Sequence, residues 1–297
     1  MFHKDVSSYV LDLICVGLTT LDILGCPIDA IPADESGQLI DGIEVVPAGT
    51  AGGTAMVAAR LGLRVALVSA LGDDRIGTFV RGALAAEGVA TYLTPSVVGA
   101  RTSATILPID STGRRPTFHA VGASSGMMLL PTHYQALAGA RFVHYGAIGA
   151  PRMDGGAGAA YLQAAKAAGA FVTCDLIAPR SGAVAEVARL LPFVDVFMPS
   201  LAEARFLTGT NDASEAALGL LGMGAASCVV KCGAEGVKLV SRDGVVAVPG
   251  FAVDVVDTTS CGDAFCAGFI VGLARGWEIR AAARFGCARS SRGSRPA

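Results

Sequence analysis

The feature that most constrains the fold is a regular alternation of short apolar runs and helical patterns, which begins near residue 136. The alternation predicts strands at 142–145, 171–175, 194–198, 228–231 and 237–241, with helices between them at about 157–168, 182–191, 201–207 and 212–223. Strands that alternate with helices are typical of βαβ units, whose strands lie parallel in one sheet. The sequence therefore predicts an α/β fold with a mostly parallel central sheet flanked by helices.

The N-terminal part begins with the same pattern. A strand is expected at 10–16, and the turn after it carries Asp22. Because α/β proteins bind ligands at the carboxyl ends of their parallel strands, Asp22 is a candidate site residue. An ordinary turn aspartate is the alternative. Further along, the pattern predicts a helix at 55–61, a strand at 65–70 and a helix at 78–87.

Two segments, at about 26–46 and 100–121, have a different pattern. Each consists of short pieces in which apolar and polar residues alternate, with turn residues between them. Alternation with a period of two is typical of strands that are exposed on one face. The two segments are expected to pair as a small β-sheet that projects from the main domain.

A polar stretch at 257–263, with the sequence DTTSCGD, leads directly into an apolar run at 264–274 that predicts a buried helix. The unpaired N–H groups and the dipole at a helix N-terminus attract anions, and small residues let a phosphate approach closely. Asp263, in the first turn, is then well placed to take a proton from an alcohol that attacks a phosphate. The alternative is a capped helix with Ser260 or Asp263 as its N-cap and no further role.

The stretch DTTSCGD resembles the D-T-x-G-x-G-D signature of the ribokinase (PfkB) family of sugar and nucleoside kinases. The resemblance implies a ribokinase-like three-layer fold in which the small sheet is a lid over the sugar. It also implies that Asp263 is the catalytic base and that the backbone of Ser260, Cys261 and Gly262 forms an anion hole. Ser260 stands where the family has its first Gly. If that position needs a positive φ, a serine there is unfavourable.

The resemblance extends to residues that bind the sugar. Gly17 and Asp22 fit the family's G-x-x-x-x-D pattern, in which the Asp binds sugar hydroxyls. The segment 47–55 resembles P-G-G-x-x-x-N-x-A, and Leu71–Gly77 fits the G-x-D-x-x-G turn. The implied sugar contacts in segment 47–55 are Gly49, Gly52 and Gly53, although Ala48 replaces one Gly and Gly53 replaces the Asn. No G-K-[ST] or G-x-G-x-x-G pattern is present in segment 47–55.

The nucleotide and metal residues are also implied by the resemblance. The segment 198–204 is similar to P-N-x-x-E-A, which implies that Ser200 and Glu203 help to hold magnesium, largely through water. A helix N-cap with a capping box is the alternative for this pair. The segment 231–236 resembles the nucleotide-binding turn. The implied ATP contacts are Lys231, Gly233, Gly236 and Thr258, and potassium would lie near Asp257 and Thr259. Asp175 and Arg180 match the family more loosely.

Composition excludes several other classes of protein. The chain has 297 residues, of which 52% are hydrophobic and 16% are charged, so it can bury a large core. Its net charge of −2 gives no basic field for nucleic acid. We expect no transmembrane helix and no signal peptide, and therefore a cytoplasmic protein. The eight cysteines include no C-x-x-C pair and are expected to be free thiols.

The chain is expected to form a single domain over 1–288, followed by a polar, disordered tail at 289–297. In the resembled family another helix follows and helps to form the adenine site, so the C-terminus is expected to be truncated. The expected function is transfer of the γ-phosphate of ATP to a hydroxymethyl group of a small sugar or sugar-like alcohol. ATP, Mg²⁺ and K⁺ are the implied cofactors. The lid sheet either closes a monomer or pairs two chains as a homodimer, and both alternatives remain open.

Two other functions remain open at this stage. A nucleoside kinase would need an aromatic or broad apolar pocket for the base, for which Phe118 and Tyr145 are the candidates. A non-catalytic protein that binds a sugar or nucleotide would account for the substitutions at Ser260, Gly53 and Ser200.

Overall fold

The computed structural model describes residues 11–253 and 258–292. In these residues the largest sheet has nine strands in the order β15-β14-β13-β12-β11-β10-β1-β4-β6. The strands from β13 to β6 are parallel to their neighbours, while β14 and β15 form antiparallel pairs at one edge. Their bounds are β1 Leu11–Gly17, β4 Val65–Val68, β6 Val89–Ala90, β10 Ala140–Gly146, β11 Phe171–Cys174, β12 Val196–Phe197, β13 Cys228–Lys231, β14 Val237–Ser241 and β15 Gly244–Val248. The predicted, mostly parallel sheet is confirmed, and β6 and β15 are additional strands.

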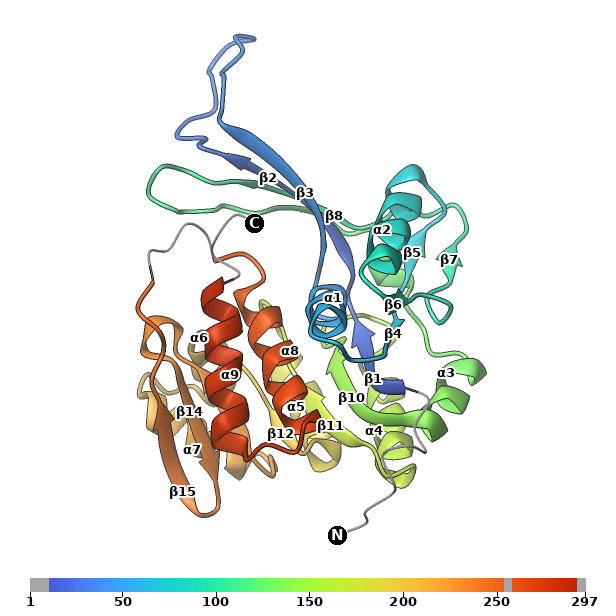
Figure 1. Ribbon diagram of the computed structural model, residues 1–297, viewed down its shortest axis with the longest axis vertical. Coiled ribbons are helices and arrows are strands. Elements are labelled where there is room, and N and C mark those ends of the chain that lie inside the picture. Colours follow the sequence, from blue (N-terminus) through green and yellow to red (C-terminus); the bar gives the residue numbers. More distant parts are fainter. Residues whose placement is uncertain (1–10, 254–257, 293–297) are drawn as a thin grey trace.

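Helices cover both faces of this sheet (Figure 1). In Figure 1, α8 (Cys261–Ala274) and α9 (Ile279–Arg292) lie in front of the sheet. Helix α1 (Gly52–Arg60) packs against α8 on that same face. The opposite face carries α4 (Ala157–Ala167), α5 (Ala183–Leu190), α6 (Leu201–Thr208) and α7 (Ala213–Gly222). Two further helices are α2 (Arg75–Ala86) and α3 (Pro131–Ala136), and the short strands β5 (Leu71–Gly72) and β7 (Ser96–Val97) form a separate pair.

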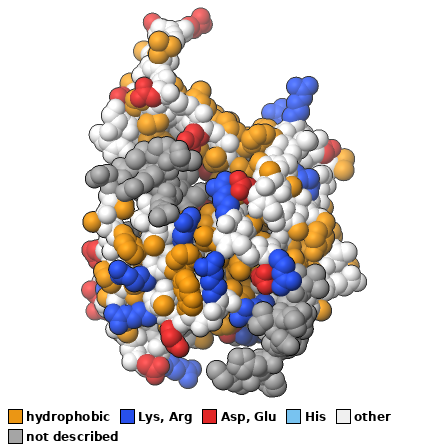
Figure 2. Space-filling view, viewed as in Figure 1, with side chains coloured by type: hydrophobic (Ala, Val, Ile, Leu, Met, Phe, Trp, Pro, Cys, Tyr) orange, Lys and Arg blue, Asp and Glu red, His pale blue; other side chains and the backbone are white. Residues whose placement is uncertain are grey.

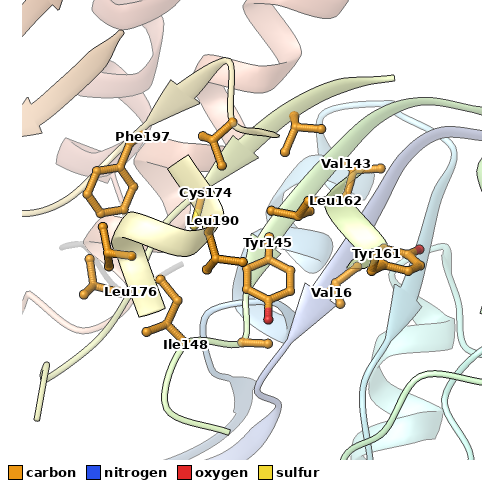
Figure 3. Close-up of a cluster of buried hydrophobic side chains, with 14 of the residues drawn as sticks. Val16, Val143, Tyr145, Ile148, Tyr161, Leu162, Cys174, Leu176, Leu190 and Phe197 are labelled. Atoms are coloured by element: carbon orange, nitrogen blue, oxygen red, sulfur yellow. The ribbon is translucent and has the colours of Figure 1, made fainter. Parts of the chain in front are cut away.

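The core consists of the two layers between the sheet and its helices. Strand residues alternate between these layers, so that Val16, Val143 and Tyr145 face one side, where they meet Leu162 of α4 and Leu190 of α5 (Figure 3). The intervening strand residues face α1 and α8. Burial on both faces explains why these strands are continuous apolar runs in the sequence.

A second sheet has four strands in the order β3-β2-β8-β9, and it corresponds to the predicted lid. The strands are β2 (Thr20–Cys26), β3 (Gly42–Ala48), β8 (Ala104–Pro108) and β9 (Phe118–Ala120). In Figure 1, β2 and β3 extend well beyond the helices and the central sheet. The expected pieces in 26–46 and 100–121 supply three of the strands.

The expectation that Asp22 lies in a turn is wrong. Asp22 lies within β2, where it pairs with Val46 of β3 and Thr105 of β8. The sequence of β2 alternates in the way that a strand requires, and two neighbouring strands complete its hydrogen bonds. Asp22 therefore reaches the site from the lid sheet.

The lid has two chemically different faces because successive strand residues point to opposite sides. Asp22, Thr105 and His119 lie in register across one face. Ile23 and Ile106 lie in register on the other face. Residues 27–41, between β2 and β3, contain no strand and form an exposed arm. Figure 2 shows acidic side chains at the tip of this projection.

The expected start of a disordered tail at residue 289 is wrong for its first four residues. Helix α9 continues to Arg292, whereas 293–297 lie outside the described residues. The added turn is fixed by contacts that the sequence does not reveal. Cys261 Sγ donates to the carbonyl oxygen of Ser290, and Ser291 Oγ donates to that of Ala288. The Arg289 side chain packs over Gly268 of α8.

Within the described residues, no helix is both long and apolar enough to cross a membrane.

Candidate active site

A cleft of about 1470 Å³ lies between the lid and the helix start at α8. It is lined by most of the predicted site residues, which are Asp22, Gly49, Ser200, Glu203, Lys231, Gly233, Gly236, Thr258, Thr259, Ser260, Cys261, Gly262 and Asp263. Gly52 and Gly53 are not among the lining residues, and Asp257 lies outside the described residues. Residues far apart in the sequence thus meet in one cavity that is large enough for two small ligands.

The N-terminus of α8 opens into this cleft. Ser260 precedes the helix with φ 54° and ψ 11°, which is the left-handed conformation. A non-glycine residue is unfavourable there by about 1 kcal/mol. Ala178 is the other non-glycine residue with a positive φ in the described chain, and it lines the same cleft. Backbone strain of this kind is often concentrated at functional sites.

The carboxylate of Asp263 lies against the first turn of α1. A Cβ atom on Gly53 would stand 2.6 Å from Asp263 Oδ2, so a side chain at position 53 would force the carboxylate to move. Gly52 is packed in the same way against Thr19. Gly49 has a φ of +92° and lines the cleft directly. The glycines of this segment thus have different surroundings, and Gly53 leaves room for Asp263.

Asp263 has a pKa that suits a base near neutral pH. Burial raises the pKa of its carboxyl to about 7, and the nearby Asp175 and Asp22 also act to raise it. Lys231 and a hydrogen bond from Ser260 act in the opposite direction. A carboxyl group with such a pKa is about half ionised at neutral pH, and its ionised form is a stronger base than an ordinary aspartate.

The other end of the cleft is formed by the polar face of the lid. Burial raises the pKa of Asp22, although a hydrogen bond with Thr105 and the charges of His119 and Arg115 oppose this effect. Asp22 is only 8% exposed, and its Oδ1 atom has no hydrogen-bond partner among the described residues. A buried carboxylate oxygen without a partner is unfavourable unless a ligand donates to it.

Arg115 was not predicted from the sequence. It lies between β8 and β9 and reaches across the cleft, where Nε donates to Thr258 Oγ1 (2.9 Å) and Nη2 to the Thr258 carbonyl oxygen (3.2 Å). The lid is thus tied to the loop that precedes α8. Most arginines are exposed to solvent. A single arginine in a turn therefore carries no sequence pattern that would mark it as a site residue.

The floor of the cleft contains an ion pair between two strands. Lys231 Nζ, at the end of β13, lies 2.6 Å from Oδ2 of Asp175, which follows β11. Arg180, which was predicted with Asp175, also lines the cleft but is exposed. Next to Lys231, Gly233 and Gly236 have positive φ angles, and a Cβ on Gly236 would lie 2.2 Å from the carbonyl oxygen of Val248. Only glycine fits at position 236.

Ser200 and Glu203 form the capping box that was the alternative to a metal role. Glu203 donates its backbone N–H to Ser200 Oγ (3.2 Å), and Ser200 N–H donates to Glu203 Oε2 (2.6 Å). Both residues also line the cleft, and burial, followed by the charge of Asp175, raises the pKa of Glu203. No group of three or more His, Cys, Asp or Glu in the described chain could hold a metal by itself. One carboxylate fits a magnesium ion that is held mainly by phosphates and water.

The two candidates for a nucleoside-base pocket are wrong. Tyr145 is fully buried in the core, and Phe118 is 54% exposed. Neither residue lines the cleft.

Comparisons with known proteins agree with this geometry. The family model "pfkB family carbohydrate kinase" matches residues 11–292. The chain is 30% identical to a probable fructokinase-4 of Arabidopsis thaliana, over 80% of this chain and 77% of that protein. It is also 30% identical to a fructokinase of Klebsiella pneumoniae, over 83% and 81% of the two chains.

Solved structures show the same fold. A putative ribokinase II from E. coli in complex with ATP and Mg²⁺ superposes with a TM-score of 0.83 at 21% identity, covering 97% of this chain and 94% of that one. The ribokinase-like fold, the lid and the family model together support one conclusion: the chain belongs to the pfkB family of carbohydrate kinases.

Proposed function

We propose that this protein transfers the γ-phosphate of ATP to a hydroxymethyl group of a small sugar or sugar-like alcohol. The observation that carries the proposal is the position of Asp263. Its carboxylate lies at the N-terminus of α8, has a pKa of about 7, and shares a cleft with the partly unsatisfied carboxylate of Asp22. A base, an anion site and an acceptor site are the three parts that this reaction needs.

In the proposed mechanism, Asp22 accepts hydrogen bonds from sugar hydroxyls and directs the reacting hydroxyl toward Asp263. Asp263 takes the proton of that hydroxyl as the oxygen attacks the γ-phosphorus. The new P–O bond forms while the bond to the β-phosphate oxygen breaks, and ADP leaves. The backbone N–H groups of Ser260, Cys261 and Gly262 stabilise the charge on the transferred phosphate.

The turn with Lys231, Gly233 and Gly236 is the proposed nucleotide side, together with Thr258. Magnesium, when bound, would neutralise phosphate charge, and Glu203 with Ser200 would contribute to holding it through water. We also propose a potassium site near Thr259 and Asp257. Its test is the dependence of turnover on K⁺ compared with Na⁺.

The experiment that tests the function is ADP release from purified protein with Mg-ATP and K⁺. The acceptors are fructose, other ketoses and aldoses, sugar acids and nucleosides. Asp263→Asn is assayed in parallel. Turnover on a sugar that is lost in the variant is expected. Binding of ATP and sugar by both proteins without turnover on any acceptor would instead identify a non-catalytic binding protein.

We further propose that two copies pair through the outer face of the lid. On this face, Ile23 pairs with Val45 and Ile106, and Ile106 pairs in turn with Phe118. Three of these four side chains are exposed, namely Val45 (42%), Ile106 (55%) and Phe118 (54%). An exposed apolar row on a sheet favours a covering partner. Sedimentation equilibrium should give a dimer for the wild type and a monomer for Ile106→Lys. Val246→Lys, at an exposed position on β15, is the matched control.

A cytoplasmic location is part of the proposal. All eight cysteines are free, and Cys15, Cys174, Cys228, Cys266 and Cys287 are buried. Free thiols in the core are typical of proteins from a reducing compartment.

A further inference from the structure

The Asp175–Lys231 ion pair is the least explained part of the cleft. The side chains of Asp175 and Lys231 are 5% and 14% exposed. Asp175 follows β11 and Lys231 ends β13, and these two strands are separated by β12. Removing two charges from water is unfavourable, and a buried ion pair is weak evidence for a role in stability alone. The pair therefore calls for a functional explanation.

The surroundings of the pair are unbalanced in charge. Glu203 and Asp263 each lie near enough to interact electrostatically with both Asp175 and Lys231. Asp22 interacts in the same way with Asp263. Lys231 is the only lysine or arginine on a strand of the central sheet among the described residues that line the cleft; the other cleft cations, Arg115 and Arg180, lie on loops. One fixed cation thus lies among several carboxylates, at the place where a further anion is expected to bind.

The hydrogen bonds of Lys231 leave capacity for a ligand. An ammonium group has three N–H donors. Among the described residues, Nζ has one hydrogen-bond partner, Oδ2 of Asp175. Asp175 is itself held by the N–H of Leu176 (2.9 Å to Oδ1) and the thiol of Cys266 (3.4 Å to Oδ2). Asp175 is therefore fixed and holds Lys231 by one of its three donors.

The ammonium group also lies at the start of α8. Lys231 Nζ stands 3.4 Å from the point that a Cβ on Gly262 would occupy. The N–H of Gly262 is one of the proposed anion-hole donors. A phosphate oxygen bound there would be within reach of the remaining donors of Lys231.

We propose that Lys231 is a catalytic residue that contacts the transferred phosphate, and that Asp175 is the positioning residue that holds its ammonium group at the anion hole. The proposal rests on the proposed kinase function and makes it more specific. Lys231 stabilises charge on the phosphate during transfer, and its positive charge also favours the ionised form of Asp263. Asp175 has the opposite electrostatic effect on Asp263.

The first test is a binding comparison that needs no turnover. Calorimetry measures the affinity of Mg-ADP and of the non-hydrolysable analogue Mg-AMP-PNP for the wild type and Lys231→Met. Loss of about 10- to 100-fold in affinity for AMP-PNP, with less than about twofold loss for ADP, is expected for a contact with the terminal phosphate. Equal losses for both nucleotides, or no loss, would overturn the proposal.

Three further variants distinguish the loss of a phosphate contact from misfolding. Lys231→Met leaves the buried charge of Asp175 without a cation beside it. Lys231→Met combined with Asp175→Asn removes both charges and should fold. The double variant should show the same contrast between the nucleotides. Lys231→Arg should restore part of the affinity for AMP-PNP. Lys166→Met is the matched control, because Lys166 forms an ion pair of similar length with Asp195 away from the cleft.

Kinetics provide the second test. Lys231→Met should lower kcat by about 10²- to 10³-fold with little change in the sugar KM. The acidic limb of its pH profile should move to higher pH, and that of Asp175→Asn to lower pH. Besides Asp175 and Lys231, the ionisable groups that face Asp263 are Asp22, Cys15 and Cys266. Unchanged kcat and pH profiles, with only a lower Tm, would mean that the pair is structural.

If the wild type binds nucleotide but phosphorylates no acceptor, the proposed function fails. The ADP and AMP-PNP comparison still decides the role of Lys231 in that case.

Discussion

The two ends of the cleft are built from different parts of the molecule. At the catalytic end, Asp263 lies in α8, Lys231 ends β13 and Asp175 directly follows β11. The central sheet that carries these strands is covered on both faces. At the acceptor end, Asp22 and His119 come from a lid sheet whose outer face is exposed. The first arrangement holds charges rigidly for one chemical step. The second can change its residues without disturbing the core, and specificity is expected to depend on it.

The largest effect is expected at the catalytic end. Asp263→Asn keeps the shape of the side chain but removes the base, so kcat should fall by about 10³-fold while the KM for ATP changes little. Steady-state kinetics on the best acceptor measure both values. A fall of less than about tenfold would mean that another group takes the proton.

The same variant has a predicted effect on stability. Because the folded pKa of Asp263 is raised from 3.8 to about 7, its ionisation lowers the free energy of unfolding as the pH rises through this range. Asp263→Asn should therefore have a higher Tm than the wild type at pH 8, and this advantage should be absent at pH 4. Thermal unfolding at both values checks the sign.

A smaller and different effect is expected at the acceptor end. Asp22→Asn weakens hydrogen bonds from sugar hydroxyls, so kcat/KM for the sugar should fall by about 10- to 100-fold, mostly through KM. The KM for ATP should stay within about twofold. A loss confined to kcat would contradict the assignment of Asp22 to sugar binding. The two ends of the cleft would then not have separate roles.

Arg115 connects the two ends, and its loss should be milder. Arg115→Gln removes the charged donor to Thr258, so kcat/KM should fall by about tenfold as the lid loses one contact with the body. Arg114→Gln is the matched control, since the exposed Arg114 forms its ion pair with Asp110 in the lid turn, four residues away. Equal losses of kcat/KM in the two variants would mean that the contact of Arg115 with Thr258 has no particular role in activity.

The smallest effect concerns the strained residue at the anion hole. Ser260→Gly relieves a left-handed serine, so it should stabilise the protein by about 1 kcal/mol and raise the Tm by about 2–4 °C. Ser260→Ala keeps the backbone strain and removes the hydroxyl, so it should give no such rise. A rise in Tm for both substitutions would show that the hydroxyl, and not the backbone, is unfavourable.

The sequence predicted the features that depend on local patterns. The strands around Tyr145 and Cys174 are continuous apolar runs because both faces of the sheet are covered, and the small residues before Asp263 mark a helix start. The capping box of Ser200 and Glu203 is equally local, since its two residues are three positions apart.

The features that were missed depend on tertiary contacts. Asp22 was expected in a turn, but it lies in a strand whose partners are β3 and β8. The contact of Arg115 with Thr258 spans 143 residues, and that of Lys231 with Asp175 spans 56. The last turn of α9 is stabilised by α8. None of these pairings leaves a periodic signal in the chain.

The most direct test of the central claim, that Asp263 is the base of the cleft, is the pH dependence of kcat/KM for the wild type. Because burial and the neighbouring carboxylates raise the pKa of Asp263 to about 7, activity should fall tenfold per pH unit below that value and level off above it. The residual activity of Asp263→Asn should lack this limb. A flat wild-type profile between about pH 5.5 and 8.5, or the same limb in the variant, would contradict the assignment of Asp263 as the base.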